Sequence, residues 1–514
     1  MPFPKFILLI FSLLTIANPA TAQQKKQVIN YLITLNGKVM GHSQNYFVIL
    51  KNKNIASHSL AQMSIKRAGS TLHMTTHTIY EESPDFKTVS LTHTQWQSIP
   101  GQPQLKNKTS KRLIFSDDHV TLSVTSADQK TTHQRLPLPV VKQIITPMRM
   151  LILFHQALLQ GKKQLQYTAL SPETGLTPMT LTTHFLGKTT LPLEGKKRGV
   201  YKSISENSLT PTLRITSHTD SYGTPVRLDI PVGPFKMRYT QTTQPIPPIT
   251  PAEVFIPTLI KPTGILKSPA QSVGATYILT LKKTLKTPGG TPKKTSLHFP
   301  RAASQTPIWA NQRTLVLHID TTRSVTPKDD LPTAKHRESS HMIAWKNKHV
   351  LQLHQRALRE KIFLNHRGTA IKLKKFVYKS IAKKDFNSAN ATASQVAVNL
   401  SGDCTEHAVL LTALLRASKI PSRTVIGLVA VSGSDLNKPS FGFHMWTQAW
   451  IDDDPIGGRW IDLDATRLGR FDASHIALGT SDQSDRRGAI HDTLQILPFL
   501  TGSVKIHIKN VTYK

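Results

Sequence analysis

Cysteine is nearly absent from the sequence, because Cys404 is the only one among 514 residues. A disulfide within one molecule is impossible, which excludes the class of disulfide-framework proteins. In an oxidising compartment an unpaired thiol is a chemical liability, so its retention favours a chemical role. The alternative is an inert core residue, since free cysteine is commonly buried. Cys404 is therefore the first candidate for a functional residue.

Acidic residues are scarce in most of the chain. The sequence has 65 Lys and Arg against 30 Asp and Glu. Residues 401–514 contain 12 residues of each sign, so the whole excess of 35 positive charges belongs to residues 1–400. Such a surface attracts anionic envelope polymers, unless the excess is only a compositional bias of solvated lysines. The basic runs KNKN and KTPGGTPKK lack interleaved aromatic residues, so no specific nucleic-acid partner is predicted.

Long apolar runs are also missing. The run FILLIFSLLTIA, which follows Lys5, is shorter than the roughly 20 residues that span a bilayer. Ala20, Thr21 and Ala22 fit a small-x-small cleavage site. We therefore expect residues 1–22 to be a signal peptide, with no transmembrane anchor after cleavage and a periplasmic or secreted protein.

The remaining chain divides by composition into a multidomain protein of mostly antiparallel β modules followed by an α+β domain. Residues 23–242 have short strand patterns between turn residues, with a helical insert predicted near 140–163. Residues 243–337 are Pro- and Thr-rich linkers that flank a small β module. Residues 338–514 show helical periodicity and then strands, which predicts the α+β domain.

The residues around Cys404 predict the start of a helix. Asp403 is a good N-cap, and Glu406 completes a capping box, which makes Cys404 the first helical residue. The helix dipole and the unsatisfied N–H groups at this end favour the thiolate over the thiol. Gly402 is expected to leave space beside the sulfur for a substrate. The segment therefore predicts a nucleophilic cysteine.

A predicted hairpin supplies a histidine and two acids. His444 and Trp446 alternate onto one face of FGFHMWTQAWI, and Asp462 and Asp464 share a face of GRWIDLDATR. A turn centred near Asp454 would place His444 opposite Asp464, and cross-strand Cβ atoms lie about 5 Å apart. The alternative is a hairpin whose polar face meets solvent. The tryptophans on that face favour a site instead.

Together, the motifs GDCTEHAVLLTALLRASKIPSRTVIGLV, FGFHMWTQAWI and GRWIDLDATR resemble the transglutaminase-like superfamily. The resemblance implies a papain-like α+β core in a bacterial exported member. Matched position by position, it implies that Cys404 is the nucleophile, His444 the general base and Asp464 the orienting acid. It assigns no function to the N-terminal modules, although exported members commonly carry such strand-rich regions.

Other residues could support the site. Asp462 is a rival for the orienting role, and Gln395 is a candidate side-chain donor to an oxyanion. His407 is expected to pack beside the site and tune the thiol, and Trp446 to line it. A zinc site of Cys404, His407 and His444 is conceivable, but a structural site would want more sulfur and no fourth ligand has suitable spacing. We therefore expect no metal and no cofactor.

The predicted activity is acyl transfer at an amide bond through a thioester on Cys404. Peptides, proteins or peptidoglycan-stem amides are the expected substrates. Hydrolysis is favoured over crosslinking, because transfer to an amine would need a tunnel that excludes water. Trp446, Trp450 and Trp460 could wall such a tunnel, although alternating aromatics on a hairpin are more often core. The alternative from another class is a catalytically idle scaffold or polymer-binding module.

Overall fold

The structure is a computed structural model. It describes residues 28–67, 70–98, 108–125, 131–137, 144–170, 178–209, 213–232, 235–253, 259–281, 299–301, 303–323, 328–359, 365–382, 391–431, 439–452, 457–483, 499 and 504–514. The predicted signal peptide and its cleavage point lie outside these residues. Within them, no helix combines the length and apolar character needed to cross a membrane.

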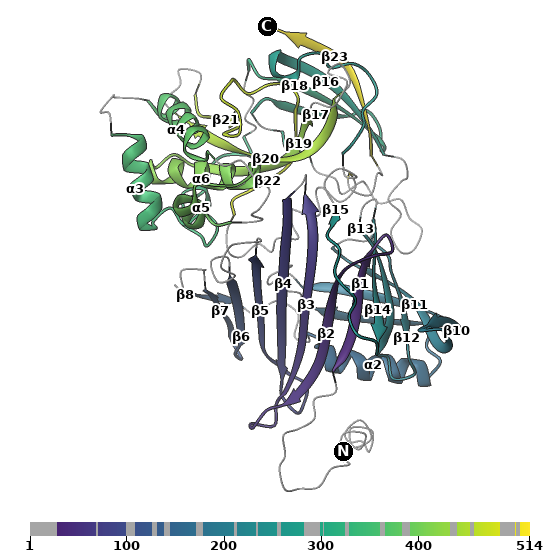
Figure 1. The fold of residues 1–514 in the computed structure, drawn as a ribbon. Coiled ribbons are helices and arrows are strands. Elements are labelled where there is room, and N and C mark those ends of the chain that lie inside the picture. Colours follow the sequence, from purple (N-terminus) through teal and green to yellow (C-terminus); the bar gives the residue numbers. More distant parts are fainter. Residues whose placement is uncertain are drawn as a thin grey trace.

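One large sheet accounts for the N-terminal part of the described chain. Its strands follow the order β8-β7-β6-β5-β4-β3-β2-β1-β14-β13-β12-β11-β10-β9, each antiparallel to its neighbour (Figure 1). Burial alternates along strands such as β7, as expected where one face packs inward. The prediction of antiparallel β modules is confirmed. The strands are β1 (Ile29–Leu35), β2 (Lys38–Ile49), β3 (Ile55–Arg67), β4 (Ser70–Glu82), β5 (Thr88–Ser98), β6 (Thr109–Phe115), β7 (His119–Thr125), β8 (Thr131–Pro137), β9 (Gln164–Ala169), β10 (Met179–Leu193), β11 (Lys196–Asn207), β12 (Ile215–Thr219), β13 (Pro225–Val232) and β14 (Phe235–Thr242).

A helix interrupts the order of strands inside the predicted insert. Helix α2 spans Pro147–Leu159 and begins with a proline, which is favoured at the first helical position. Phe154 and His155 are buried, and His155 Nδ1 lies 2.7 Å from the carbonyl oxygen of Ser221. Residues 140–143 of the predicted range lie outside the described chain.

The Pro-rich segments predicted as linkers are docked on the neighbouring domains. Strand β15 (Ala252–Glu253) pairs in parallel with β3, and Ile260 forms a bridge with Phe441. The second Pro-rich segment, which contains Asp330, is held in place by that residue. The Asp330 carboxylate accepts two hydrogen bonds from Arg423, at 2.6 and 2.7 Å. Trp460 Nε1 also donates to the carbonyl oxygen of Asp330 at 2.7 Å. Proline limits ladder pairing, but it does not prevent docking through single bonds and side chains.

The small β module is completed by the end of the chain. β16 (Ser272–Leu281) lies between β18 (Thr314–Asp320) and β23 (Val504–Tyr513), and β17 (Gln305–Trp309) forms the outer edge. This sheet shares a hydrophobic core with the α+β domain, in which Tyr277 packs edge-on against Phe441. The predicted boundary at residue 338 therefore cuts through one packed unit. A periodic pattern identifies a strand, but it cannot name a partner that lies over 200 residues away.

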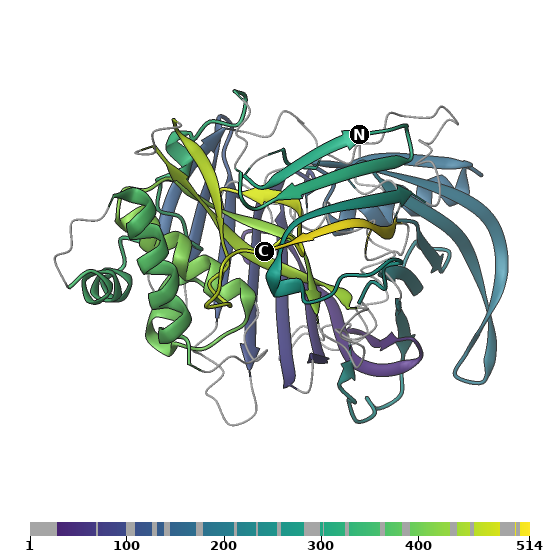
Figure 2. The same ribbon diagram turned by 90° about the horizontal axis from the view of Figure 1, so that it is seen from above.

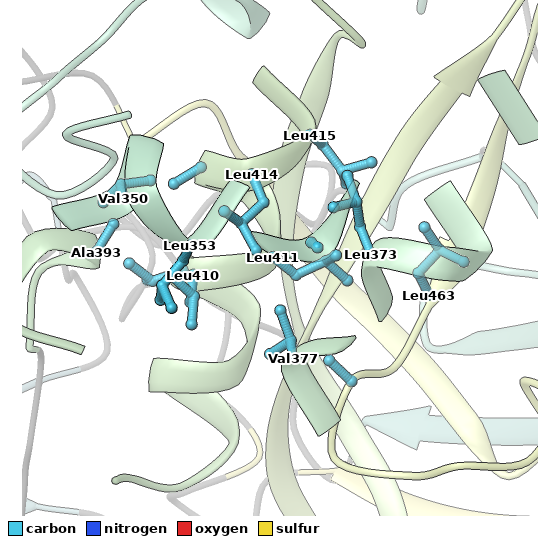
Figure 3. Packing of buried hydrophobic residues seen from close by; sticks show 14 of the residues in the cluster. Val350, Leu353, Leu373, Val377, Ala393, Leu410, Leu411, Leu414, Leu415 and Leu463 are labelled. Atoms are coloured by element: carbon cyan, nitrogen blue, oxygen red, sulfur yellow. The ribbon is translucent and has the colours of Figure 1, made fainter. Parts of the chain in front are cut away.

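The α+β domain has helices gathered on one side of a four-stranded sheet (Figures 1 and 2). Helix α6 packs against β20, and its leucines form a buried core with α3 and α4 (Figure 3). Each such buried leucine contributes about 1.5–3 kcal/mol. This core fixes the position of the helix that begins at Cys404. The elements are α3 (Lys348–Ala357), α4 (His366–Ser380), α5 (Ala393–Asn399), α6 (Cys404–Ala417), β19 (Ser422–Val431), β20 (Ser440–Ile451), β21 (Arg459–Leu463) and β22 (His475–Ser481), with sheet order β21-β20-β19-β22.

Candidate active site

Helix α6 begins at Cys404, as the sequence predicts. The Asp403 side chain accepts a hydrogen bond from the Thr405 amide at 2.9 Å, and Glu406 Oε2 accepts one from the Asp403 amide at 3.0 Å. The predicted capping box is therefore present. Cys404 itself is partly exposed, while both capping residues are buried. The thiol thus stands at the positive end of the helix dipole, where a thiolate is favoured.

Gly402 has a different role from the predicted one. Its φ angle is +142°, and a Cβ atom there would lie 2.4 Å from both Cβ and Cγ of Glu406. The space above Gly402 is therefore filled by the buried Glu406 side chain and is not left open beside the sulfur. Burial and the neighbouring Asp403 charge hold the pKa of Glu406 well above its usual range. Its Oε1 also accepts from the Ala391 amide at 3.1 Å, which ties α6 to the segment before α5.

Packing between α6 and β20 sets the direction of the helix relative to the strand that carries His444. Thr447 Oγ1 donates to the carbonyl oxygen of Ala408 at 3.0 Å, one turn after Cys404. Further along the helix, the carbonyl oxygen of Thr412 accepts from Ser422, the residue that pairs with Ala449. Helix and strand therefore run in the same direction. The Cys404 end of α6 consequently lies at the end of β20 that carries His444.

His444 and Asp464 form a hydrogen-bonded pair. His444 Nε2 lies 3.0 Å from Asp464 Oδ2, and the two side chains are 10% and 3% exposed. A proton on Nε2 donates to the carboxylate, so Nδ1 is the ring nitrogen that can exchange a proton with a reactant. Asp464 Oδ1 accepts from both the amide and the hydroxyl of Thr466. Burial alone would raise the pKa of Asp464, but the charge and hydrogen bonds of His444 and His475 hold it well below its usual range.

The predicted register of the hairpin is wrong by two residues. Trp450 lies opposite Trp460, so residues whose numbers sum to 910 face each other, not 908. Strand β21 ends at Leu463, and Asp464 reaches His444 from the turn that follows it. The contact survives because a shift of two residues keeps the same face of the strand inward.

Asp462 forms hydrogen bonds with Trp446, whose ring lies beside His444, and not with His444 itself. Its Oδ1 accepts from Trp446 Nε1 at 2.9 Å and from Gln448 Nε2 at 2.8 Å, and its Oδ2 accepts from the Ser304 hydroxyl. The Trp446 ring lies 6.2 Å from the His444 ring at an interplanar angle of 26°. Asp462 therefore supports the site indirectly, through an aromatic side chain that is only 1% exposed.

The two other candidate support residues, His407 and Gln395, contact backbone groups at the first turns of α6 and α5. His407 is buried, and its Nδ1 lies 2.6 Å from the carbonyl oxygen of Asp403. Gln395 Oε1 accepts from the Thr392 amide at 2.8 Å, as part of the capping box of α5. His407 thus braces the turn that carries Cys404. The oxyanion role of Gln395 remains a prediction.

His475 is a residue of the site that sequence reasoning missed. It begins β22, and its Nε2 lies 3.2 Å from Asp464 Oδ2 while its Nδ1 lies 3.0 Å from Asp472 Oδ1. Burial would lower the pKa of His475, but hydrogen bonds to the two carboxylates raise it to about 9. In the described chain, the clustered groups that could hold a metal ion are those of His444, Asp464 and His475, a set without Cys404 or His407. The only signal in the sequence was an aspartate three residues before a histidine.

Comparisons with known proteins identify the domain. A model of the transglutaminase-like superfamily matches residues 364–465, which include all three predicted catalytic residues. A comparison with curated proteins found no significant match.

Among solved structures, the chain is similar to a β-barrel-like protein of a domain of unknown function from Brucella abortus (14% identity, 43% of this chain and 98% of that one, TM-score 0.33). It is also similar to a proposed cysteine protease from Cytophaga hutchinsonii (16% identity, 47% and 86%, TM-score 0.23) and to a proposed protease from Parabacteroides distasonis (8% identity, 78% and 65%, TM-score 0.17). At these TM-scores the likenesses carry no conclusion about function. Residues 364–465 belong, by their match to the family model, to the transglutaminase-like superfamily.

Proposed function

We propose that this protein is a cysteine-dependent enzyme that cleaves amide bonds through a thioester on Cys404. The observation that carries the proposal is the His444–Asp464 pair, whose nitrogen and oxygen lie 3.0 Å apart at the end of β20 where α6 presents the thiol. A nucleophile, a base and a group that orients the base are the parts that acyl transfer requires. A scaffold would have no use for a thiol held at a helix start.

The reaction follows from these positions. The Cys404 thiolate attacks the amide carbonyl carbon, and the π electrons move to oxygen, where the backbone N–H of Cys404 stabilises the charge. The carbonyl then re-forms as the C–N bond breaks, and protonated His444 gives its Nδ1 proton to the departing amine. Water next attacks the thioester as His444 takes its proton. Collapse of that intermediate releases the acid and returns the thiolate and the protonated imidazole.

Hydrolysis is supported over crosslinking by the burial of the hairpin tryptophans. Trp446 is 1% exposed and Trp460 is 0% exposed, while Trp450 packs edge-on against Trp460. These three rings are packed as core residues, so within the described part of the chain they do not line an open acceptor tunnel. Transfer to an amine needs a tunnel that excludes water, and rings buried in the core do not supply one, so water at about 55 M is the favoured acceptor.

Incubation with a glutamine-bearing peptide and a labelled primary amine tests the reaction. We expect free acid and ammonia, no incorporated label, and no turnover by Cys404→Ala. Stable label that depends on Cys404 would show a crosslinking enzyme instead. If a folded protein with a reactive thiol turns over neither this peptide nor peptidoglycan-stem peptides, the scaffold function is favoured.

We also propose that the protein is exported and that its basic N-terminal sheet holds an anionic envelope polymer. Lys188, Lys196 and Lys197 are exposed on the hairpin of β10 and β11, where they add positive charge to this surface. Binding of the whole protein to lipopolysaccharide should weaken steeply as salt rises, and replacing the three lysines with glutamine should weaken it further. Binding that ignores both changes would contradict an electrostatic partner surface.

A further inference from the structure

Four side chains form a hydrogen-bonded chain that leads to the proposed base. Asp472 Oδ1 lies 3.0 Å from His475 Nδ1, His475 Nε2 lies 3.2 Å from Asp464 Oδ2, and the same oxygen lies 3.0 Å from His444 Nε2. Carboxylates and imidazole rings alternate along this series of contacts. The two imidazole rings are 5.8 Å apart, joined through a single carboxylate oxygen.

His475 cannot touch a substrate. Its side chain is 0% exposed, and its ring packs against Phe471 at 4.1 Å and edge-on against Trp446 at 5.3 Å. The charged and titratable groups that surround this chain come from several elements. They are Asp464, Arg467 and Asp472 of the loop after β21, His444 of β20, Lys374 of α4 and Tyr277 of β16. Lys374 donates a hydrogen bond to the carbonyl oxygen of Leu468, and Tyr277 donates one to the carbonyl oxygen of Ala473.

The geometry sets the protonation of His475. Both ring nitrogens face carboxylate oxygens, which only accept hydrogen bonds, so the ring must carry a proton on each nitrogen to satisfy both. A buried imidazolium is stable here because two carboxylates surround it. Asp464 thus receives one hydrogen bond that does not depend on the protonation state of His444.

We propose that His475 is a positioning residue for the amide cleavage proposed above, because its doubly protonated ring holds the Asp464 carboxylate in the orientation that aligns His444. The inference rests on the proposed function. His475 acts through Asp464, so its effect should vanish when Asp464 cannot accept. The expected consequence is a loss of turnover without a loss of substrate binding.

A double-mutant cycle tests this coupling. His475→Gln, Asp464→Asn and the double variant are compared in kcat and KM for the glutamine peptide and in alkylation of Cys404 by iodoacetamide at pH 7. We expect His475→Gln to lower both kcat and the alkylation rate by about 10- to 100-fold with unchanged KM. In the Asp464→Asn background it should add little. His318→Gln is the matched control, because His318 is an exposed strand histidine that contacts Thr276.

Two results would overturn the proposal: a folded His475→Gln protein that alkylates at the wild-type rate, or losses that multiply in the double variant. Alkylation needs no amide substrate, so it decides the role of His475 even if the proposed reaction fails.

A spectroscopic readout covers the case in which His475→Gln does not fold. Wild-type protein labelled with ¹⁵N-histidine should show two slowly exchanging ring N–H signals from one histidine. These signals should persist up to about pH 9, because burial lowers the pKa of His475 but the two carboxylates raise it to about 9. Asp472→Asn should weaken one of these two signals, and like His475→Gln it should lower the rate at which Cys404 is alkylated. A single ring N–H at neutral pH would contradict the doubly protonated ring and overturn the proposal.

Discussion

Asp464→Asn is expected to lower kcat by about 10³- to 10⁴-fold, whereas Asp462→Asn should lower it by no more than about tenfold. The reason is the different partner of each acid. Asp464 accepts from His444 at 3.0 Å and from His475 at 3.2 Å, so an amide there leaves both rings without their charged acceptor. Asp462 accepts from Trp446 and Gln448, and an asparagine oxygen can still accept from those neutral donors.

The measurement is the steady-state rate of both variants on one substrate, with urea unfolding as a control for stability. Asp462→Asn serves as the matched variant, because both changes replace one carboxylate oxygen with an NH₂ group only two residues apart. Equal losses would mean that the position of the Trp446 ring contributes as much to kcat as the orientation of His444. A larger loss at Asp462 would transfer the orienting role to it.

Gly402→Ala is expected to lower the free energy of unfolding by about 3 kcal/mol or more. An alanine would keep a φ of +142°, which L residues rarely adopt, and its Cβ would lie 2.4 Å from two atoms of the Glu406 side chain. Glu406 cannot move away freely, because it accepts hydrogen bonds from the Ala391 and Asp403 amides. The capping box at the start of α6 should therefore open.

Urea denaturation checks this prediction, with Gly469→Ala as the control. Gly469 lies in the same domain, and a Cβ atom there would meet nothing within 4 Å. We expect that control to change stability by less than about 0.5 kcal/mol. Because Gly402 precedes the helix that presents Cys404, the variant should also lose rapid alkylation of the thiol. A stable Gly402→Ala protein would mean that the loop before α6 can relax, which would contradict the tight packing against Glu406.

The local structure around the thiol could be predicted from the sequence because its contacts lie within a few residues. Asp403, Cys404 and Glu406 form a capping box over a single turn, so residue types and spacing were sufficient. The same holds for α2 and for the inward face of β20, whose side-chain periodicity depends only on local backbone geometry. Export and catalysis remain predictions.

Contacts between distant segments were decided only by the tertiary structure. His475 reaches Asp464 because β22 pairs with β19, and no pattern around residue 475 encodes that neighbour. Likewise, β23 completes the sheet of β16 from the far end of the chain. The hairpin register and the packing of Glu406 over Gly402 depend on turn geometry and on side chains that meet only after folding. The sequence by itself thus determined which residues start the helix and face the sheet. Contacts formed only on folding then decided that Asp464, and not Asp462, binds His444, and the pairing of β22 with β19 placed His475 behind Asp464, because that pairing joins segments far apart in the chain.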